Sequence, residues 1–208
     1  RRAVQDGRIK LVSYPEMLAW DRFRADREGW PFWPCYSLGG NDVILNNPDM
    51  KEYTCPVTGR RAWALPAAKP DVVVIHGYQG DKYGNVRLQG HSMLPQAMDV
   101  EMARSCSTVL VTLEELIDNA EIRKTPELTQ IPAMRVSGVT PVAHGSHPLS
   151  TLLKCREDEA HMRLYAEAAK TPEEFREYLD RYVYSTADEQ QYRQVIGEEQ
   201  LAGLEEEE

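Results

Sequence analysis

Two short runs of apolar residues, each bounded by turn-forming residues, dominate the middle of the chain. The first run is Val72–Ile75, which follows Pro70-Asp71, and the second is Thr108–Thr112. Continuous β-branched runs of this length predict strands that are buried on both faces. Between them, apolar residues recur at every fourth position and mark one face of a helix: Leu94, Met98, Met102 and Cys106. This order predicts an α/β fold with a parallel sheet and helices on both faces.

The N-terminal pattern predicts one more strand and one more helix. A short strand is expected over residues 9–12. Ser13 and Glu16 then have the spacing of a capping box, so a helix should begin there and continue to about Arg27. This helix should bury its apolar side chains, namely Met17, Trp20 and Phe23. Glu16 therefore has a structural explanation as a capping carboxylate, beside any functional one.

Residues 29–67 show neither a helical nor a strand period that is sustained. The segment is rich in glycine, proline and aromatic residues, and we expect an ordered loop in which Trp30, Phe32 and Trp33 pack against the sheet. Long loops inside compact domains usually carry function or are rigidly packed. Within it, Ser37, Gly39 and Gly40 form a turn where backbone amides could approach a ligand closely, although a plain turn explains the same letters.

The C-terminal third has the pattern of several helices. Apolar stripes at helical spacing occur over residues 162–169, 175–183 and 192–196, and Thr171–Glu174 has the letters of a second capping box. Before these helices, a strand is expected over residues 133–136. The final residues are acidic, so we expect one domain over residues 1–200 and an acidic disordered tail over 201–208.

Composition narrows the classes of function. The formal net charge of −9 disfavours nucleic-acid binding, and no apolar run is long enough to span a membrane. The four cysteines show no CxxC spacing, which is typical of reduced thiols in a cytoplasmic protein. A zinc site that uses Cys35 or Cys55 lacks a ligand pair with finger-like spacing. His144 and His147 have H-x-x-H spacing, but a loop does not fix their geometry, so no metal is expected.

Polar residues follow both predicted buried strands. His76, Gln79 and Asp81 come after the first strand, and Glu114 comes after the second. Ligands of open parallel sheets bind beyond the carboxyl ends of the strands, so these side chains are candidates for a site at that edge. Two of them have simpler explanations. His76 suits a satisfied core histidine, and Asp81 suits a structural turn with Gly84.

The chain resembles the A (alpha) subunit of the family I CoA-transferases, most closely the glutaconate CoA-transferase type. The likeness rests on the pattern IH-x-x-x-x-D-x-x-GN over residues 75–85 and VLVT-x-EE over 109–115. The order and spacing of four further motifs extend it over nearly the whole chain: Pro31–Pro34, Ser37–Asp42, Thr54–Gly59 and Ala143–Pro148. The resemblance implies an open, mostly parallel sheet with helices on both faces, and a chain that lacks the N-terminal strands of the family.

The resemblance also implies a composite active site. In this family the glutamate nucleophile belongs to a B (beta) subunit, and this chain has no such segment. It would therefore need a B-type partner in a hetero-oligomer, with acyl-CoA and carboxylic acids as substrates and coenzyme A as a substrate rather than a resident cofactor. Ser37, Gly39, Gly40 and His144 would lie in loops that line the acyl-CoA cleft, with His76, Gln79 and Glu114 nearby.

Two alternatives remain open. In the steroid ring-cleaving CoA-ester hydrolases of the same superfamily, a glutamate placed like Glu16, before the Pro31-Phe32 pair, is the catalytic residue, and it would act here as a general base. The other alternative is a noncatalytic binding module of the superfamily. The partner sequence would separate them, because a glutamate nucleophile in it favours CoA transfer.

Overall fold

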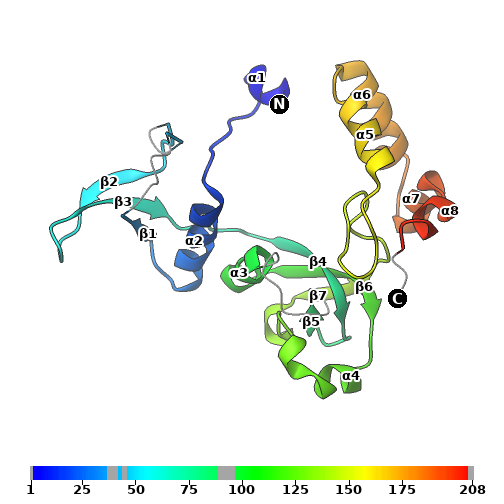
Figure 1. Cartoon of the computed structure of the whole chain (residues 1–208), viewed down its shortest axis with the longest axis horizontal. Helices are drawn as coiled ribbons and strands as arrows, with labels where there is room; N and C mark the ends of the chain where they lie inside the picture. Colours follow the sequence, from blue (N-terminus) through cyan, green and yellow to red (C-terminus); the bar gives the residue numbers. More distant parts are fainter. Residues whose placement is uncertain (1, 37–41, 44–45, 89–96, 206–208) are drawn as a thin grey trace. The chain divides into compact units, whose positions relative to one another are not determined.

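The computed structural model describes residues 2–36, 42–43, 46–88 and 97–205 (Figure 1). The chain folds as two compact units. One consists of Arg1–Val73 with Pro95–Thr108, and the other of Val74–Leu94 with Val109–Glu208. The expectation of one domain over residues 1–200 stays a prediction.

The first unit combines helices with a three-stranded antiparallel sheet. Its helices are α1 (Arg2–Gln5), α2 (Glu16–Arg27) and α3 (Ala97–Ser105). Its strands are β1 (Phe32–Cys35), β2 (Lys51–Thr54) and β3 (Arg61–Pro66), in the order β1-β3-β2. The expectation of a loop over residues 29–67 was therefore wrong in part. Strands of four to six residues, separated by turns, are too short to show a period in the sequence.

Helix α2 confirms the predicted helix, but its start differs from the prediction. Pro15 is the N-cap and no side chain caps the helix, so Ser13 and Glu16 do not form a capping box. The carbonyl of Ser13 instead accepts a hydrogen bond from Asn47 Nδ2 at 2.8 Å.

The buried face of α2 also differs from the expected one. Leu18 and Ala25 are buried and Met17 is exposed. The strand expected over residues 9–12 was also wrong, because Ile9 and Leu11 are exposed and pair with no strand among the described residues.

The second unit is built on a four-stranded sheet with the order β5-β4-β6-β7. Its strands are β4 (Val73–Gly80), β5 (Val86–Arg87), β6 (Val109–Leu116) and β7 (Gly138–Pro141). Strands β6 and β7 are parallel, with Leu110 opposite Gly138, whereas β4 and β5 are antiparallel. The two central strands confirm the predicted buried strands, and both are longer than predicted.

Side chains alternate along both central strands. Ile75 and Val111 are 3% and 2% exposed, whereas Val74 and Leu110 are 68% and 42% exposed. The expectation that both faces of these strands are buried was therefore wrong. Successive side chains of a strand point to opposite faces, and a run of valines does not reveal which faces are covered.

The turn between β4 and β5 is held by Asp81, as expected for a structural turn. Its carboxylate accepts hydrogen bonds from the backbone N–H of Tyr83 and of Asn85, each at 3.0 Å, and from the side chains of Asn85 and Asn119. Gly84 has a φ of 96°, which favours glycine. Asp81 is fully buried and all its acceptor capacity serves the turn.

Three short helices connect β6 to β7 in the second unit: α4 (Asn119–Lys124), η2 (Pro126–Leu128) and η3 (Ala133–Arg135). The strand expected over residues 133–136 was wrong, because η3 occupies that place and the strand is β7. Pro132 precedes η3, and Met134 is 88% exposed, so the apolar letters there do not mark a buried strand.

The C-terminal part is helical, as predicted (Figure 1). Its elements are α5 (Glu159–Ala168), α6 (Pro172–Leu179), the π-helix η4 (Asp180–Tyr184), α7 (Glu189–Ile196) and α8 (Glu198–Ala202). Thr171 caps α6 by accepting the N–H of Glu174 at 3.2 Å, which confirms the predicted N-cap. The Glu174 carboxylate accepts from the Thr171 hydroxyl at 2.9 Å rather than from the Thr171 backbone N–H of a full capping box.

Residues 201–205, which the sequence assigned to the start of an acidic tail, lie in and directly after α8. Leu201 is fully buried, and the carbonyl of Leu204 accepts the N–H of Arg156 at 2.8 Å. All four cysteines are buried, reduced thiols, as the sequence predicted. Among the described residues, no helix is long and apolar enough to cross a membrane.

Candidate functional site

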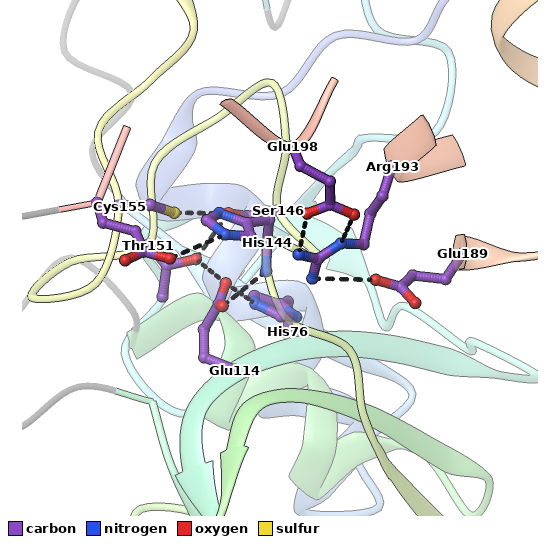
Figure 2. Close-up of polar contacts among 10 residues, drawn as sticks. His76, Glu114, His144, Ser146, Thr151, Cys155, Glu189, Arg193 and Glu198 are labelled. Carbon is purple, nitrogen blue, oxygen red and sulfur yellow. Dashed lines mark hydrogen bonds and ion pairs between the residues drawn. The ribbon is translucent and has the colours of Figure 1, made fainter. Parts of the chain in front are cut away.

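A buried carboxylate of the second unit that joins three segments of the chain is Glu114, near the carboxyl end of β6. It accepts hydrogen bonds from His76 Nε2 at 2.7 Å, from the backbone N–H of His144 at 2.7 Å, and from Thr151 Oγ1 at 2.9 Å (Figure 2). Its side chain is 5% exposed. Glu114 therefore ties β4 and the loop after β7 to the end of β6. We call His76, Glu114, His144 and Thr151 the Glu114 cluster.

The surroundings of Glu114 keep it ionised. Burial alone would raise the pKa of this carboxyl, but the hydrogen bonds from His76, His144 and Thr151 outweigh burial and lower the pKa below its ordinary value of 4.5. A carboxylate that is charged and already accepts three hydrogen bonds has little capacity left to attack a substrate. Its chemistry suits positioning the loop rather than nucleophilic catalysis.

His76 is fixed from both sides. Its Nδ1 lies 2.8 Å from Thr112 Oγ1 and its Nε2 lies 2.7 Å from Glu114. A Cβ at Gly145 would lie 2.6 Å from His76 Cε1, so only glycine lets the loop approach the imidazole this closely. His76 is thus a satisfied histidine within β4, as the structural explanation of the sequence predicted, and it also supports the loop.

His144 has an unusual backbone and an unsatisfied side chain. Its φ is 57°, a left-handed conformation that non-glycine residues adopt mainly where surrounding contacts enforce it. The enforcing contact is the hydrogen bond from its N–H to Glu114. Its side chain is 9% exposed, and its Nε2 lies 3.4 Å from Glu205. Its Nδ1 is buried and has no hydrogen-bond partner among the described residues.

A cavity of about 320 Å³ lies between this loop and the C-terminal helices of the same unit. Its lining includes His144, His147, Tyr182, Val183, Tyr192 and Arg193. Figure 2 shows Arg193 between two carboxylates, Glu198 at 2.7 Å and Glu189 at 3.6 Å. The Arg193 cation is therefore neutralised by the protein itself.

Gln79 and Glu115 form a second, exposed pair of side chains on β4 and β6. Gln79 Nε2 donates to Glu115 Oε2 at 2.8 Å, and Lys154 Nζ lies 3.4 Å from the same carboxylate. The Lys154 ammonium also lies 5.5 Å from the centre of the Tyr78 ring. This pair lines the same strand ends as Glu114 but is open to solvent.

The structure brings together part of the predicted site. His76, Glu114 and His144 meet in the Glu114 cluster, and Gln79 lies on the same strand as His76. Glu16 belongs to the other unit, where it is exposed and begins α2. The candidate binding residues of the glycine-rich turn lie outside the described residues: Ser37, Gly39 and Gly40.

Thr112 and Thr151 were missed as members of the site. Thr112 lies in the VLVT segment, two positions before Glu114, and period-2 alternation could have placed both on one face. Thr151 follows Glu114 by 37 residues, and no local signal links the two. Only the folded loop brings the threonine hydroxyl to the carboxylate.

Comparisons with known proteins identify relatives over most of the chain. The alpha-type chain of glutaconate CoA-transferase from Acidaminococcus fermentans is 30% identical over 98% of this chain and 68% of that protein. The alpha-type chain of 3-oxoadipate CoA-transferase from Pseudomonas knackmussii is 30% identical over 84% of this chain. The IpdA subunit of the cholesterol ring-cleaving hydrolase from Rhodococcus jostii is 30% identical over 77% of this chain and 56% of that protein.

The crystal structure of the Acidaminococcus fermentans glutaconate CoA-transferase matches the fold with a TM-score of 0.88, over 100% of this chain and 69% of that chain, at 26% identity. No family model matches the sequence. The chain spans 43% of the length of a relative from Archaeoglobus fulgidus, to which it is 35% identical over 95% of this chain, and 60% of the length of the Pseudomonas knackmussii relative.

The identity to the glutaconate enzyme extends over nearly the whole chain and over more than two thirds of that relative, and the folds agree. These findings confirm the resemblance read from the IH-x-x-x-x-D-x-x-GN and VLVT-x-EE segments. The chain belongs to the A-subunit family of the CoA-transferases.

Proposed function

We propose that this chain is the alpha-type half of a two-subunit CoA-transferase that moves CoA between short or dicarboxylic acyl groups. It contributes to acyl-CoA binding, and a B-type partner subunit supplies the glutamate nucleophile. The relatives named for transfer to glutaconate and 3-oxoadipate support dicarboxylic acids as the substrate class. Coenzyme A enters as a substrate, and no resident cofactor is needed. The four reduced cysteines suit the reducing cytoplasm.

The observation that carries the proposal is the bonding of Glu114. CoA transfer needs a carboxylate that can attack a thioester carbonyl carbon. Glu114 is the buried glutamate at the expected sheet edge, and three hydrogen bonds from protein groups already occupy it. A nucleophile in a partner chain leaves Glu114 free to hold the His144 loop in place. The His144 loop then lines the substrate site, with His76 and Glu114 as positioning residues.

The proposed reaction balances without an added reagent. The partner's glutamate attacks the donor thioester and forms a mixed anhydride, which releases the CoA thiolate. The thiolate attacks the glutamyl carbonyl, forms a glutamyl–CoA thioester and frees the donor carboxylate. The acceptor carboxylate reverses these steps and leaves as the new acyl-CoA.

The test uses the natural chain co-expressed with a B-type subunit from the same organism. Acetyl-CoA and either glutaconate or 3-oxoadipate are supplied, and the new acyl-CoA is measured. Borohydride or hydroxylamine treatment followed by mass spectrometry locates the thioester. We expect the adduct on the B-type subunit. An adduct on this chain, or turnover by this chain alone, would refute the proposal.

The hydrolase alternative is favoured by one specific observation. Glu16 is exposed, and the capping box that would have explained it is absent. The Rhodococcus relative is named as a ring-cleaving hydrolase subunit. In that function Glu16 would act as the general base that activates water. Glu16→Gln in the assembled pair separates the two functions, since only a hydrolase loses a proton acceptor.

A further inference from the structure

A cluster of metal-ligating side chains lies outside the Glu114 cluster, where the loop after β7 meets α5. It consists of His147, Asp158 and His161, each of which offers one ligand atom, and the three atoms lie within 4.8 Å of one another. His147 and Asp158 are 2% and 4% exposed, and His161 is 4% exposed. Charged and ionisable groups buried together are typically paired or coordinate a metal.

The distances are close to those around a bound ion. His147 Nε2 and Asp158 Oδ2 lie 3.2 Å apart. Two ligand atoms of a tetrahedral Zn²⁺, each about 2.0–2.2 Å from the ion, are separated by about 3.3 Å. The first two ligands are therefore already spaced for one ion. The ligand atom of His161 lies within 4.8 Å of both, so it completes the set by an approach of about 1–1.5 Å or less.

The other polar atoms of these side chains are held by neighbours. His147 Nδ1 lies 2.7 Å from the Tyr192 hydroxyl, and His161 Nε2 lies 2.8 Å from the Tyr178 hydroxyl. Metal-binding histidines almost always use their second ring nitrogen in such a hydrogen bond, which fixes the tautomer and the ring orientation.

Asp158 is also prepared for this role. Its Oδ1 accepts the backbone N–H of His161 at 2.8 Å, as the N-cap of α5, while Gln200 Nε2 donates to Oδ2. The cap fixes the carboxylate in orientation, and Oδ2 faces His147.

One ligand residue of the cluster also lies at the wall of the cavity described above. His147 and Tyr192 line that 320 Å³ cavity, whereas Asp158 and His161 are not among its lining residues. The structure thus provides two imidazoles, one carboxylate and hydrogen-bonded outer partners.

We propose that His147, Asp158 and His161 bind one divalent first-row transition metal ion, with Zn²⁺ as the best fit to two imidazoles and a carboxylate. The ion joins the loop after β7 to the N-terminus of α5. This site is independent of the proposed CoA transfer. It also differs from the H-x-x-H pair that the sequence offered, because His147 is paired with Asp158 and His161, and His144 is not a ligand.

The experiment uses the natural chain, purified through a tag without histidine and stripped with a chelator. Zn²⁺ or Co²⁺ is then added, and the bound metal is counted by mass spectrometry of the eluted ions. We expect one ion per chain, a higher melting temperature, and with Co²⁺ the intense visible bands of a tetrahedral site. Absence of stoichiometric binding, or a Co²⁺–thiolate charge-transfer band from the cysteines, would overturn the proposal.

Variants assign the ligands. His161→Gln keeps an amide where Nε2 meets Tyr178 but removes Nδ1, and it should weaken Co²⁺ binding at least tenfold. Tyr178→Phe keeps all three ligands and should weaken binding about 10–100-fold by freeing the imidazole. Glu159→Gln is the matched control, because it changes an exposed carboxylate beside Asp158 that is not a proposed ligand, and unchanged metal binding is expected.

Circular dichroism confirms that each variant is folded. If His161→Gln does not fold, Tyr178→Phe decides the question. Equal metal affinity in a folded ligand variant and in the control would refute the site.

Discussion

Glu114 and Glu16 are the two glutamates that the sequence offered for chemistry, and their surroundings are opposite. Glu114 is buried and accepts three hydrogen bonds from β4 and from the loop after β7. Glu16 is exposed at the first residue of α2, and it does not form a capping box. A saturated buried carboxylate stabilises structure, whereas an exposed one stays available to a substrate. Both residues are glutamates, so residue type does not separate these roles. The number of hydrogen-bond donors around the carboxylate oxygens does separate them.

The contrast between the two glutamates predicts that substituting Glu114 will have the largest effect on stability. Glu114→Ala leaves His76, the His144 amide and Thr151 without their acceptor in a buried place. We expect a loss of about 3–5 kcal/mol in the free energy of unfolding, measured by urea denaturation. Glu115→Ala is the matched control on the exposed side of the same strand and should cost about 0–1 kcal/mol. Similar losses in both variants would contradict the positioning role of Glu114.

The second largest loss of stability is expected at Gly145, because the absence of a side chain there lets the loop after β7 approach His76. In Gly145→Ala the new Cβ would lie 2.6 Å from His76 Cε1 and 2.9 Å from the Val142 carbonyl. We expect a loss of about 1–3 kcal/mol from overpacking, together with weaker acyl-CoA binding in the assembled enzyme. Gly138→Ala, whose Cβ meets Leu110 at 3.4 Å, is the control and should cost less. A neutral Gly145→Ala would show that the loop need not lie against His76.

A pH titration sharpens the comparison further. The folded state lowers the pKa of Glu114, so its stabilisation is fully present above the ordinary value of 4.5 and is lost as the pH falls through the folded pKa. The difference in unfolding free energy between the natural chain and Glu114→Gln should therefore be largest at neutral pH and shrink below pH 4.5. This comparison also cancels the contribution of Asp81, whose pKa is lowered as well. A difference that grows in acid would contradict it.

The smallest effect is expected at Glu16. Glu16→Gln should change the free energy of unfolding by no more than about 0.5 kcal/mol, because the side chain is exposed. CoA transfer by the assembled pair should change little, since the proposed nucleophile is in the partner. If the enzyme instead hydrates a cyclic acyl-CoA, the same variant should lose about 10²–10⁴ in rate. That outcome would replace the transferase by the hydrolase.

Local patterns predicted the central elements of the fold. Residues that are neighbours in the chain account for the strands β4 and β6, helix α2, the Asp81 turn and the Thr171 N-cap of α6. The three-stranded sheet over residues 32–66 was missed. Its strands are short, and the register in which they pair is not visible in the local sequence pattern. The apolar letters at 9–12 and 133–136 predicted strands that do not form, since an apolar residue can stay exposed when no partner strand lies beside it.

The sequence by itself determined the family. Its motifs occur in one order and at one spacing, and both are properties of the linear chain that can be compared without a structure. It also predicted that His76 and Glu114 lie near one edge of the sheet. The two side chains do meet, although His76 lies within β4 rather than after its end. Only the tertiary structure decided that Thr151 and the His144 amide donate hydrogen bonds to Glu114. It also decided that His147 lies beside Asp158 and His161. These contacts depend on how a long loop closes, and loop closure is a property of the whole fold rather than of local spacing.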